Sequence, residues 1–119
     1  MRNRVVLLSG VSLALLALAS CVYVFNVSPI ASFTMTSASG VTPLTVGLDP
    51  SASHDPDGTI ASYLWDFGDS QSPSTSAIPF TRTFTVQSDS ETFTIVLTVI
   101  DNQGATDTAV QYVTVNPIP

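Results

Sequence analysis

Two short polar segments contain the side chains of this 119-residue sequence that could do chemistry. The first, Ser53-His54-Asp55, has the residue types of a hydrolase triad. Adjacent residues on an extended loop point in different directions, whereas a triad needs them to converge in space. His54 is also the only histidine, so the chain offers no second imidazole base. The segment therefore predicts no nucleophilic catalysis.

Asp66 and Asp69 make up the second segment, and paired carboxylates can carry out glycoside hydrolysis. They flank Gly68 at the end of an apolar run, where the sequence predicts a turn. Short carboxylates at turns commonly accept hydrogen bonds from the backbone amides of the same turn. We therefore expect a structural role for both, no catalytic residues, and a protein that is not an enzyme.

The loop around the first segment could also bind a metal ion. Residues 53–60 follow the first eight positions of an EF-hand loop, but Leu64 stands where that loop needs a bidentate glutamate, and no helices flank it. Asp55 and Asp57 nevertheless offer hard oxygen ligands, which Ca²⁺ prefers. With one His and one Cys, the sequence disfavours transition metals. Calcium is the only cofactor that these residues suggest, and the alternative is that both carboxylates only cap turns.

A strand rich in aromatic residues follows the acidic loop and would position it. Tyr63, Trp65 and Phe67 occupy every second position, and alternate side chains of a strand share one face. The three rings should therefore point into one core, with Trp65, the only tryptophan, at the centre. Gly68-Asp69 then ends the strand with a turn.

Further alternating segments predict the rest of the fold. They are separated by turn signals such as Asp101-Asn102-Gln103-Gly104, and none shows a helical period. The six clearest of the predicted strands cover residues 30–35, 44–48, 60–67, 80–86, 92–100 and 105–115. Together the pattern predicts an all-β antiparallel sandwich of about seven short strands.

Two aromatic side chains are candidates for exposed binding residues. Tyr112 falls on the outward face of the last strand beside Val110, and Phe80 lies near a loop. An exposed ring next to apolar side chains can contact a sugar or a protein. The alternative for Tyr112 is a packing pair across neighbouring strands.

The charge balance excludes several classes of partner. The formal net charge is −6, lysine is absent, and Arg2 and Arg4 lie at the extreme N-terminus. Without that terminus, Arg82 alone faces nine carboxylates. Such a surface repels phosphate backbones and has no basic patch for anionic lipid, so we expect no nucleic acid partner.

The N-terminus has the features of an export and anchoring signal. Arg2 and Arg4 precede an apolar stretch from residue 5 to 19, and Leu18-Ala19-Ser20-Cys21 resembles a bacterial lipobox. We therefore expect residues 1–20 to be a signal peptide, Cys21 to be lipidated, and residues 21–28 to be a short linker. Residues 5–25 are also long and apolar enough for an uncleaved signal anchor, and plain secretion is a third alternative. The first two alternatives place the domain outside the cytoplasm and attach it to a membrane.

The order and spacing of several motifs resemble the PKD (polycystic kidney disease) domain over residues 29–116. These motifs are Pro29-x-Ala31-x-Phe33, Pro43-Leu44-Thr45-Val46, Ser51-x-Ser53-x-Asp55-Pro56-Asp57-Gly58, Tyr63-x-Trp65-Asp66-Phe67-Gly68-Asp69 and Leu97-Thr98-Val99-x-Asp101-Asn102-x-Gly104. The resemblance implies an Ig-like β-sandwich that acts as an accessory or interaction module. It also implies a calcium site at Asp55, Asp57 and Asp101, with Asn26 or Ser28 as further ligands.

These observations combine into one functional hypothesis. We expect a non-catalytic, membrane-anchored protein of the cell surface whose PKD-like domain mediates interaction with a protein or a polysaccharide. The alternative is a structural spacer or envelope component without a specific ligand.

Overall fold

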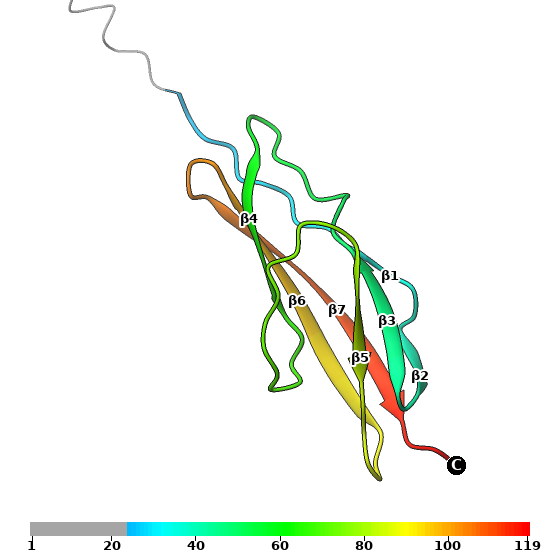
Figure 1. The fold of residues 1–119 in the computed structure, drawn as a ribbon. Helices are drawn as coiled ribbons and strands as arrows, with labels where there is room; N and C mark the ends of the chain where they lie inside the picture. The colour runs from blue at the N-terminus through cyan, green and yellow to red at the C-terminus, as the bar shows by residue number, and fades with distance from the viewer. Residues whose placement is uncertain (1–23) are drawn as a thin grey trace, which may run out of the picture.

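The computed structural model describes residues 24–119, which form two β-sheets packed face to face (Figure 1). The predicted signal peptide, lipobox and Cys21 lie outside these residues. The strands are β1 (Thr34–Met35), β2 (Ser39–Val41), β3 (Leu44–Asp49), β4 (Ile60–Asp66), β5 (Phe80–Phe84), β6 (Glu91–Asp101) and β7 (Thr106–Asn116). Within residues 24–119, no helix is long and apolar enough to cross a membrane.

The smaller sheet has the strand order β1-β3-β5, and the larger sheet has the order β2-β7-β6-β4. β6 and β7 form a long antiparallel hairpin whose register runs from Glu91 opposite Val115 to Ile100 opposite Thr106. β4 pairs with the other edge of β6, which places Trp65 opposite Leu97. The Ig-like all-β sandwich predicted from the sequence is confirmed.

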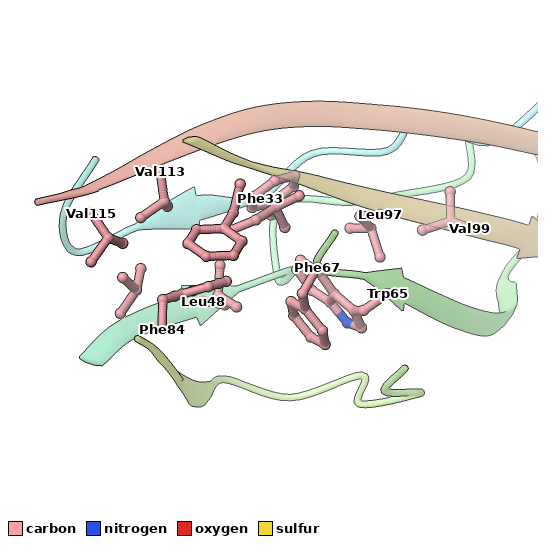
Figure 2. Packing of buried hydrophobic residues seen from close by; sticks show 12 residues of the cluster. Phe33, Leu48, Trp65, Phe67, Phe84, Leu97, Val99, Val113 and Val115 are labelled. Atoms are coloured by element: carbon pink, nitrogen blue, oxygen red, sulfur yellow. The ribbon is translucent and has the colours of Figure 1, made fainter. Parts of the chain in front are cut away.

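The core fills the space between the two sheets with side chains from alternate strand positions (Figure 2). The buried hydrophobic residues of this core are Phe33, Val46, Leu48, Trp65, Phe67, Phe84, Phe93, Ile95, Leu97, Val99, Val113 and Val115. Regular alternation along β6 buries one face of that strand and leaves the other facing outward. Because the pattern has period two, it also fixes which side chains lie on the outer face of the large sheet.

Trp65 is fully buried at the centre of this core, and its indole Nε1 donates a hydrogen bond of 2.9 Å to the Ser76 carbonyl oxygen. Its ring is stacked against Phe67, with centroids 6.2 Å apart. Tyr63 is half-buried and packs against the same cluster. The predicted inward direction of these three aromatic residues is therefore confirmed.

Phe80 does not lie on a loop surface, so the prediction of an exposed ring was wrong. It begins β5, and its ring centroid lies 5.2 Å from that of Trp65 and 6.0 Å from that of Phe67, edge-on to both. Pairing of Phe80 with Leu48 draws the ring to the core side of the small sheet. Edge-to-face packing of this kind adds to the gain from burial.

The short strand β2 was not predicted: it falls between the predicted strands over residues 30–35 and 44–48. It pairs with the end of β7 in parallel, with Gly40 opposite Val115, so the sandwich is not purely antiparallel. Three residues are too few to show an alternating pattern, and Gly40 has no side chain to contribute to one.

Candidate functional site

Two acidic loops meet at one end of the sandwich. The loop before β4 and the β6–β7 turn are joined by two hydrogen bonds: Asn102 N donates to the Thr59 carbonyl oxygen at 3.0 Å, and Thr59 N donates to Asn102 Oδ1 at 3.2 Å. The first loop contributes Asp55 and Asp57, and Asp101 ends β6 at the base of the second. The three residues that were named as calcium ligands therefore lie on neighbouring loops.

The segment before the domain closes over this end. Asn26 Nδ2 donates to Asp101 Oδ2 at 2.7 Å, and the Val27 amide donates to Asp57 Oδ2 at 2.9 Å. Asn26 and Val27 are therefore already hydrogen-bonded to the domain, although they lie inside the stretch expected to be a linker. Ser28, the alternative N-terminal ligand, is exposed.

Asp101 is almost fully buried, with 2% of its surface exposed, and its carboxylate organises the turn that follows. Oδ1 accepts hydrogen bonds from the amides of Gln103 at 2.8 Å and Ala105 at 2.9 Å. Loss of hydration raises the pKa of Asp101, but hydrogen bonds from Asn26, Gln103 and Ala105 outweigh that effect and hold its pKa below the ordinary value. Asp101 is therefore held as a carboxylate.

The pKa of the Asp55 carboxyl is shifted in the opposite direction. Loss of hydration, the side-chain hydrogen bond with Asp57 and the negative charges of Asp57 and Asp101 raise its pKa above the ordinary value, and they outweigh the hydrogen bond from the Asp57 amide, which lowers it. Its Oδ2 atom is buried and has no hydrogen-bond partner among residues 24–119. Buried polar atoms are normally paired, so this oxygen is costly to the fold as it stands.

A second unpaired oxygen lies on the segment that closes the site. Asn26 Oδ1 is also buried without a partner in the described part of the chain. Gly58 supplies the room beside the loops, because a Cβ atom there would lie 2.5 Å from Asn102 Oδ1 and 2.9 Å from Asp55 Oδ2. A side chain at position 58 would therefore crowd Asp55 Oδ2 and Asn102 Oδ1.

Oxygen atoms of carboxylates and amides, such as those at this end of the sandwich, are the ligands that a hard cation such as Ca²⁺ prefers. Two buried oxygens lack partners, the surrounding side chains carry negative charge, and calcium takes six to eight oxygen ligands. The carboxylates alone are too dispersed, since no three His, Cys, Asp or Glu side chains within residues 24–119 cluster closely enough to hold a metal ion. The amide of Asn26, backbone carbonyls or water would have to complete the coordination.

The other residues considered for catalysis are engaged in structural contacts. The Ser53 hydroxyl donates to the Ser32 carbonyl oxygen at 2.7 Å, and the Ser32 amide donates back to it at 2.9 Å. His54 Nδ1 lies 3.2 Å from the Ala52 carbonyl oxygen rather than on the Ser53 hydroxyl. Asp66 Oδ1 accepts a hydrogen bond from the Gly68 amide at 2.9 Å, as expected for a turn carboxylate.

Tyr112 lies on the outer face of the large sheet, as its position in the alternating pattern predicted. Its side chain is 59% exposed, and it stands directly opposite Thr94 of β6. Val110, two residues earlier on the same face, is also exposed. Among residues 24–119, no neighbouring ring covers Tyr112, which is therefore available to a ligand.

Sequence reasoning did not find the contact between Asn26 and Asp101 from the residues themselves. The two residues are 75 positions apart, and the distance between them in sequence gives no signal. Only the family resemblance suggested Asn26. Gly58 is part of the loop motif in the sequence. That a larger residue would not fit there became clear only from the position of Asn102 in the structure.

Comparison with known proteins agrees with this architecture. Residues 26–115 match the model of the PKD domain. The pre-pro-metalloprotease PrtV of two Vibrio cholerae serotype O1 strains is 38% identical over 91 residues, which are 76% of this chain and 9% of the protease. The chain thus spans about a tenth of the length of these relatives, and the likeness concerns one domain of them.

Solved structures show the same likeness in three dimensions. The PKD1 domain of Vibrio anguillarum Epp has a TM-score of 0.64 at 32% identity, covering 79% of this chain and all of that one. The PKD1 domain of the Vibrio cholerae metalloprotease PrtV has a TM-score of 0.62 at 36% identity, with 76% and 99% covered. A structure described as showing promiscuous specificity of carbohydrate-binding modules from the β-sandwich superfamily has a TM-score of 0.69 at 36% identity, covering 79% of this chain and 36% of that one. This chain belongs to the PKD domain family.

Proposed function

We propose that this protein is an exported, membrane-anchored interaction module that binds a polysaccharide or a protein at the cell surface and carries out no reaction of its own. The observation that carries the proposal is the match to PKD domains over residues 26–115. In the Vibrio relatives, the matching part is a small fraction of a longer protease, which suits an accessory role for this domain. The likeness to a structure concerned with carbohydrate-binding modules supports polysaccharide as one class of ligand.

Binding by the purified full chain in detergent tests this function. A glycan array and a pull-down against extracytoplasmic proteins should each be run with the wild-type chain, and at least one should give a saturable partner. A chain that binds nothing in either assay would leave a structural spacer as the better account. Turnover of a polysaccharide or peptide by the same preparation would contradict the non-catalytic role.

Attachment to the membrane through Cys21 needs a separate test. Mass spectrometry of the protein from its native membrane should find a chain that begins at an acylated Cys21, and Cys21→Ser should accumulate as unprocessed precursor. An intact N-terminus on the membrane-bound form would instead establish the signal anchor. Either result leaves the domain outside the cytoplasm, whereas release of the wild-type protein into the medium would support plain secretion.

Calcium binding is a second function that a specific observation favours. The unpaired buried oxygens of Asn26 and Asp55 would become ligands, together with the carboxylates of Asp57 and Asp101. A bound Ca²⁺ would supply positive charge to a region where the carboxylates repel one another. It would also hold the segment at Asn26 and Val27 against the two loops, so its role would be structural.

A further inference from the structure

The outer face of the large sheet differs in chemistry from the rest of the domain. Alternation along the strands places one set of side chains on this face, opposite the buried set. Its central positions are Leu64, Thr94, Val96, Thr98, Val110 and Tyr112. They carry methyl groups, hydroxyl groups and one aromatic ring, but no charge.

The strand register shows how these side chains are arranged. Asp66, Val96 and Val110 form one row across three strands, and Leu64 stands in the next row. Tyr112 lies opposite Thr94 in the row on the other side. Neighbouring strands are about 4.8 Å apart, so the rows form a broad and continuous surface.

This surface is open to solvent in residues 24–119. Tyr112 is 59% exposed, and Val110 and Leu64 are each 47% exposed. β-Strands with buried aliphatic side chains on one face commonly carry polar residues on the other, so three exposed apolar side chains on one outer face are notable. The outward ring is held on a long regular hairpin rather than on a loop, so its position is fixed by the sheet.

The negative charge of the domain restricts the class of ligand that this face can bind. The domain carries nine carboxylates against Arg82, so an acidic polymer would be repelled before it reached any face. Asp66 is the one charged side chain beside the central positions, at the margin of the face, and its Oδ1 already accepts a hydrogen bond from Gly68 N. An acidic ligand is therefore disfavoured, and because this face offers a basic ligand only the one carboxylate at its margin, its ligand should be uncharged.

We propose that this outer face is a binding platform for a neutral polysaccharide, with the Tyr112 ring stacked on the apolar face of one sugar ring. A sugar has C–H groups on its ring face and hydroxyl groups on its edge. The Tyr112 ring and the methyl groups of this sheet face can pack against the C–H groups, and the threonine hydroxyl groups can hydrogen-bond to the sugar hydroxyl groups. Tyrosine suits such a contact because it supplies a large, rigid, amphipathic surface at little cost in conformational entropy. This proposal rests on the interaction function proposed above and adds its site and ligand class.

A protein partner fits the same face less well. The centre of a protein interface is typically rich in large aromatic side chains, Met and Arg, whereas this face has one ring among threonines and small aliphatic side chains. The threonine hydroxyls would need polar partners at every second position if a protein covered them. Sugar hydroxyls supply such partners at close intervals.

Affinity electrophoresis of the full chain in detergent tests the proposal. The probes are four neutral polysaccharides (hydroxyethylcellulose, galactomannan, xylan and glycol chitin), with carboxymethylcellulose as the acidic counterpart of the first. We expect at least one neutral polysaccharide to retard the wild-type chain and carboxymethylcellulose to be inactive. Tyr112→Ala should weaken that retardation about tenfold, equivalent to ~1.4 kcal/mol, whereas Tyr112→Phe should retain it.

Ile78→Ala is the matched control, because Ile78 is 71% exposed but lies in the connection between β4 and β5, away from this face. It should leave the retardation unchanged, and Trp65 fluorescence should confirm that all variants are folded. Retardation that survives Tyr112→Ala would overturn the site and leave the proposed interaction function in place. Failure of every neutral probe, or a dimer of the wild-type chain that Tyr112→Ala dissociates, would overturn the polysaccharide platform itself.

Discussion

Arg82 holds the Asp69 carboxylate with two nitrogen atoms, Nε at 3.0 Å and Nη2 at 2.8 Å from Oδ2. The same guanidinium lies over the Phe67 ring, with Cζ 4.1 Å from the ring centroid. Both side chains of the ion pair are largely covered, with 18% of Arg82 and 8% of Asp69 exposed. The one basic residue outside the N-terminus is thus used to fasten the turn after β4 to β5.

The first prediction concerns this ion pair. Asp69→Asn should destabilise the fold by about 1–3 kcal/mol because it leaves the guanidinium without its counter-charge. Arg82→Lys should also destabilise it, since an ammonium group can neither bind bidentately nor cover the ring in the same way. Urea unfolding of both single variants and the double variant should give a coupling energy of about 1–3 kcal/mol. Asp89→Asn, in an exposed loop, is the control, and additive effects of the two variants would show that the pair is not coupled.

The second prediction concerns Trp65. Trp65→Ala should cost about 3–5 kcal/mol, because it empties the centre of the core. Trp65→Phe should cost less, although the Ser76 carbonyl oxygen then loses its donor. In the wild-type protein, the emission of Trp65 should be blue-shifted and resist quenching by iodide. A red-shifted and freely quenched emission from folded protein would contradict the burial of this side chain.

The third prediction concerns calcium. Millimolar Ca²⁺ should raise the melting temperature of the full chain more than sodium chloride of equal ionic strength, because a ligand that binds only the folded state stabilises it, by about 2.7 kcal/mol at 100 times its dissociation constant. The double variant Asp55→Asn/Asp57→Asn should lose the calcium-specific part of the response. Asp89→Asn/Glu91→Gln removes the same amount of charge elsewhere and should keep it. Equal melting curves in the two salts would leave Asp55 and Asp57 with only their turn-capping role.

The fourth prediction concerns pH in the presence of a calcium chelator. The pKa of Asp101 is held below its ordinary value of 3.8, so its contribution to stability is present above that pH and is lost as the pH falls through the lower, folded-state value. The pKa of Asp55 is raised, so its ionisation opposes folding as the pH rises through the folded-state value. At neutral pH, Asp101→Asn should therefore lower the melting temperature and Asp55→Asn should raise it. Thermal melts across the acid range check both signs, and a fall in both variants would contradict the opposite shifts.

The strands that could be predicted from the sequence are those in which apolar and polar residues alternate with a period of two. β6 was the most regular pattern and agrees with the structure within a residue at each end, because four buried apolar side chains alternate with outward ones. β2 and the position of Phe80 could not be predicted. Each depends on pairing with a strand far away in the chain, and the three residues of β2 have too little local pattern to reveal their partner.

For the candidate sites too, some features could be predicted from the sequence and others needed the structure. The direction of Tyr112 follows from its place in a long strand, so the sequence was sufficient. The acidic end needed the topology, because Asp55 and Asp101 approach only after β4 has paired with β6. The two unpaired oxygen atoms could be found only from atomic positions, because the spacing of residues in the sequence does not show that the Asn26 amide contacts a carboxylate.

The attachment of residues 31–33 to β7 has a mechanical consequence. Ala31 N donates to Asp107 and Gln111 donates to the Phe33 carbonyl oxygen, so this stretch and β7 run side by side in the same direction. The two ends of residues 24–119 leave from opposite ends of the sandwich (Figure 1). A tensile force between these ends would pull the two stretches along their lengths in opposite directions. Hydrogen bonds between strands lie across the strand direction, so they would be loaded together in shear and would resist the force as a group instead of parting one by one.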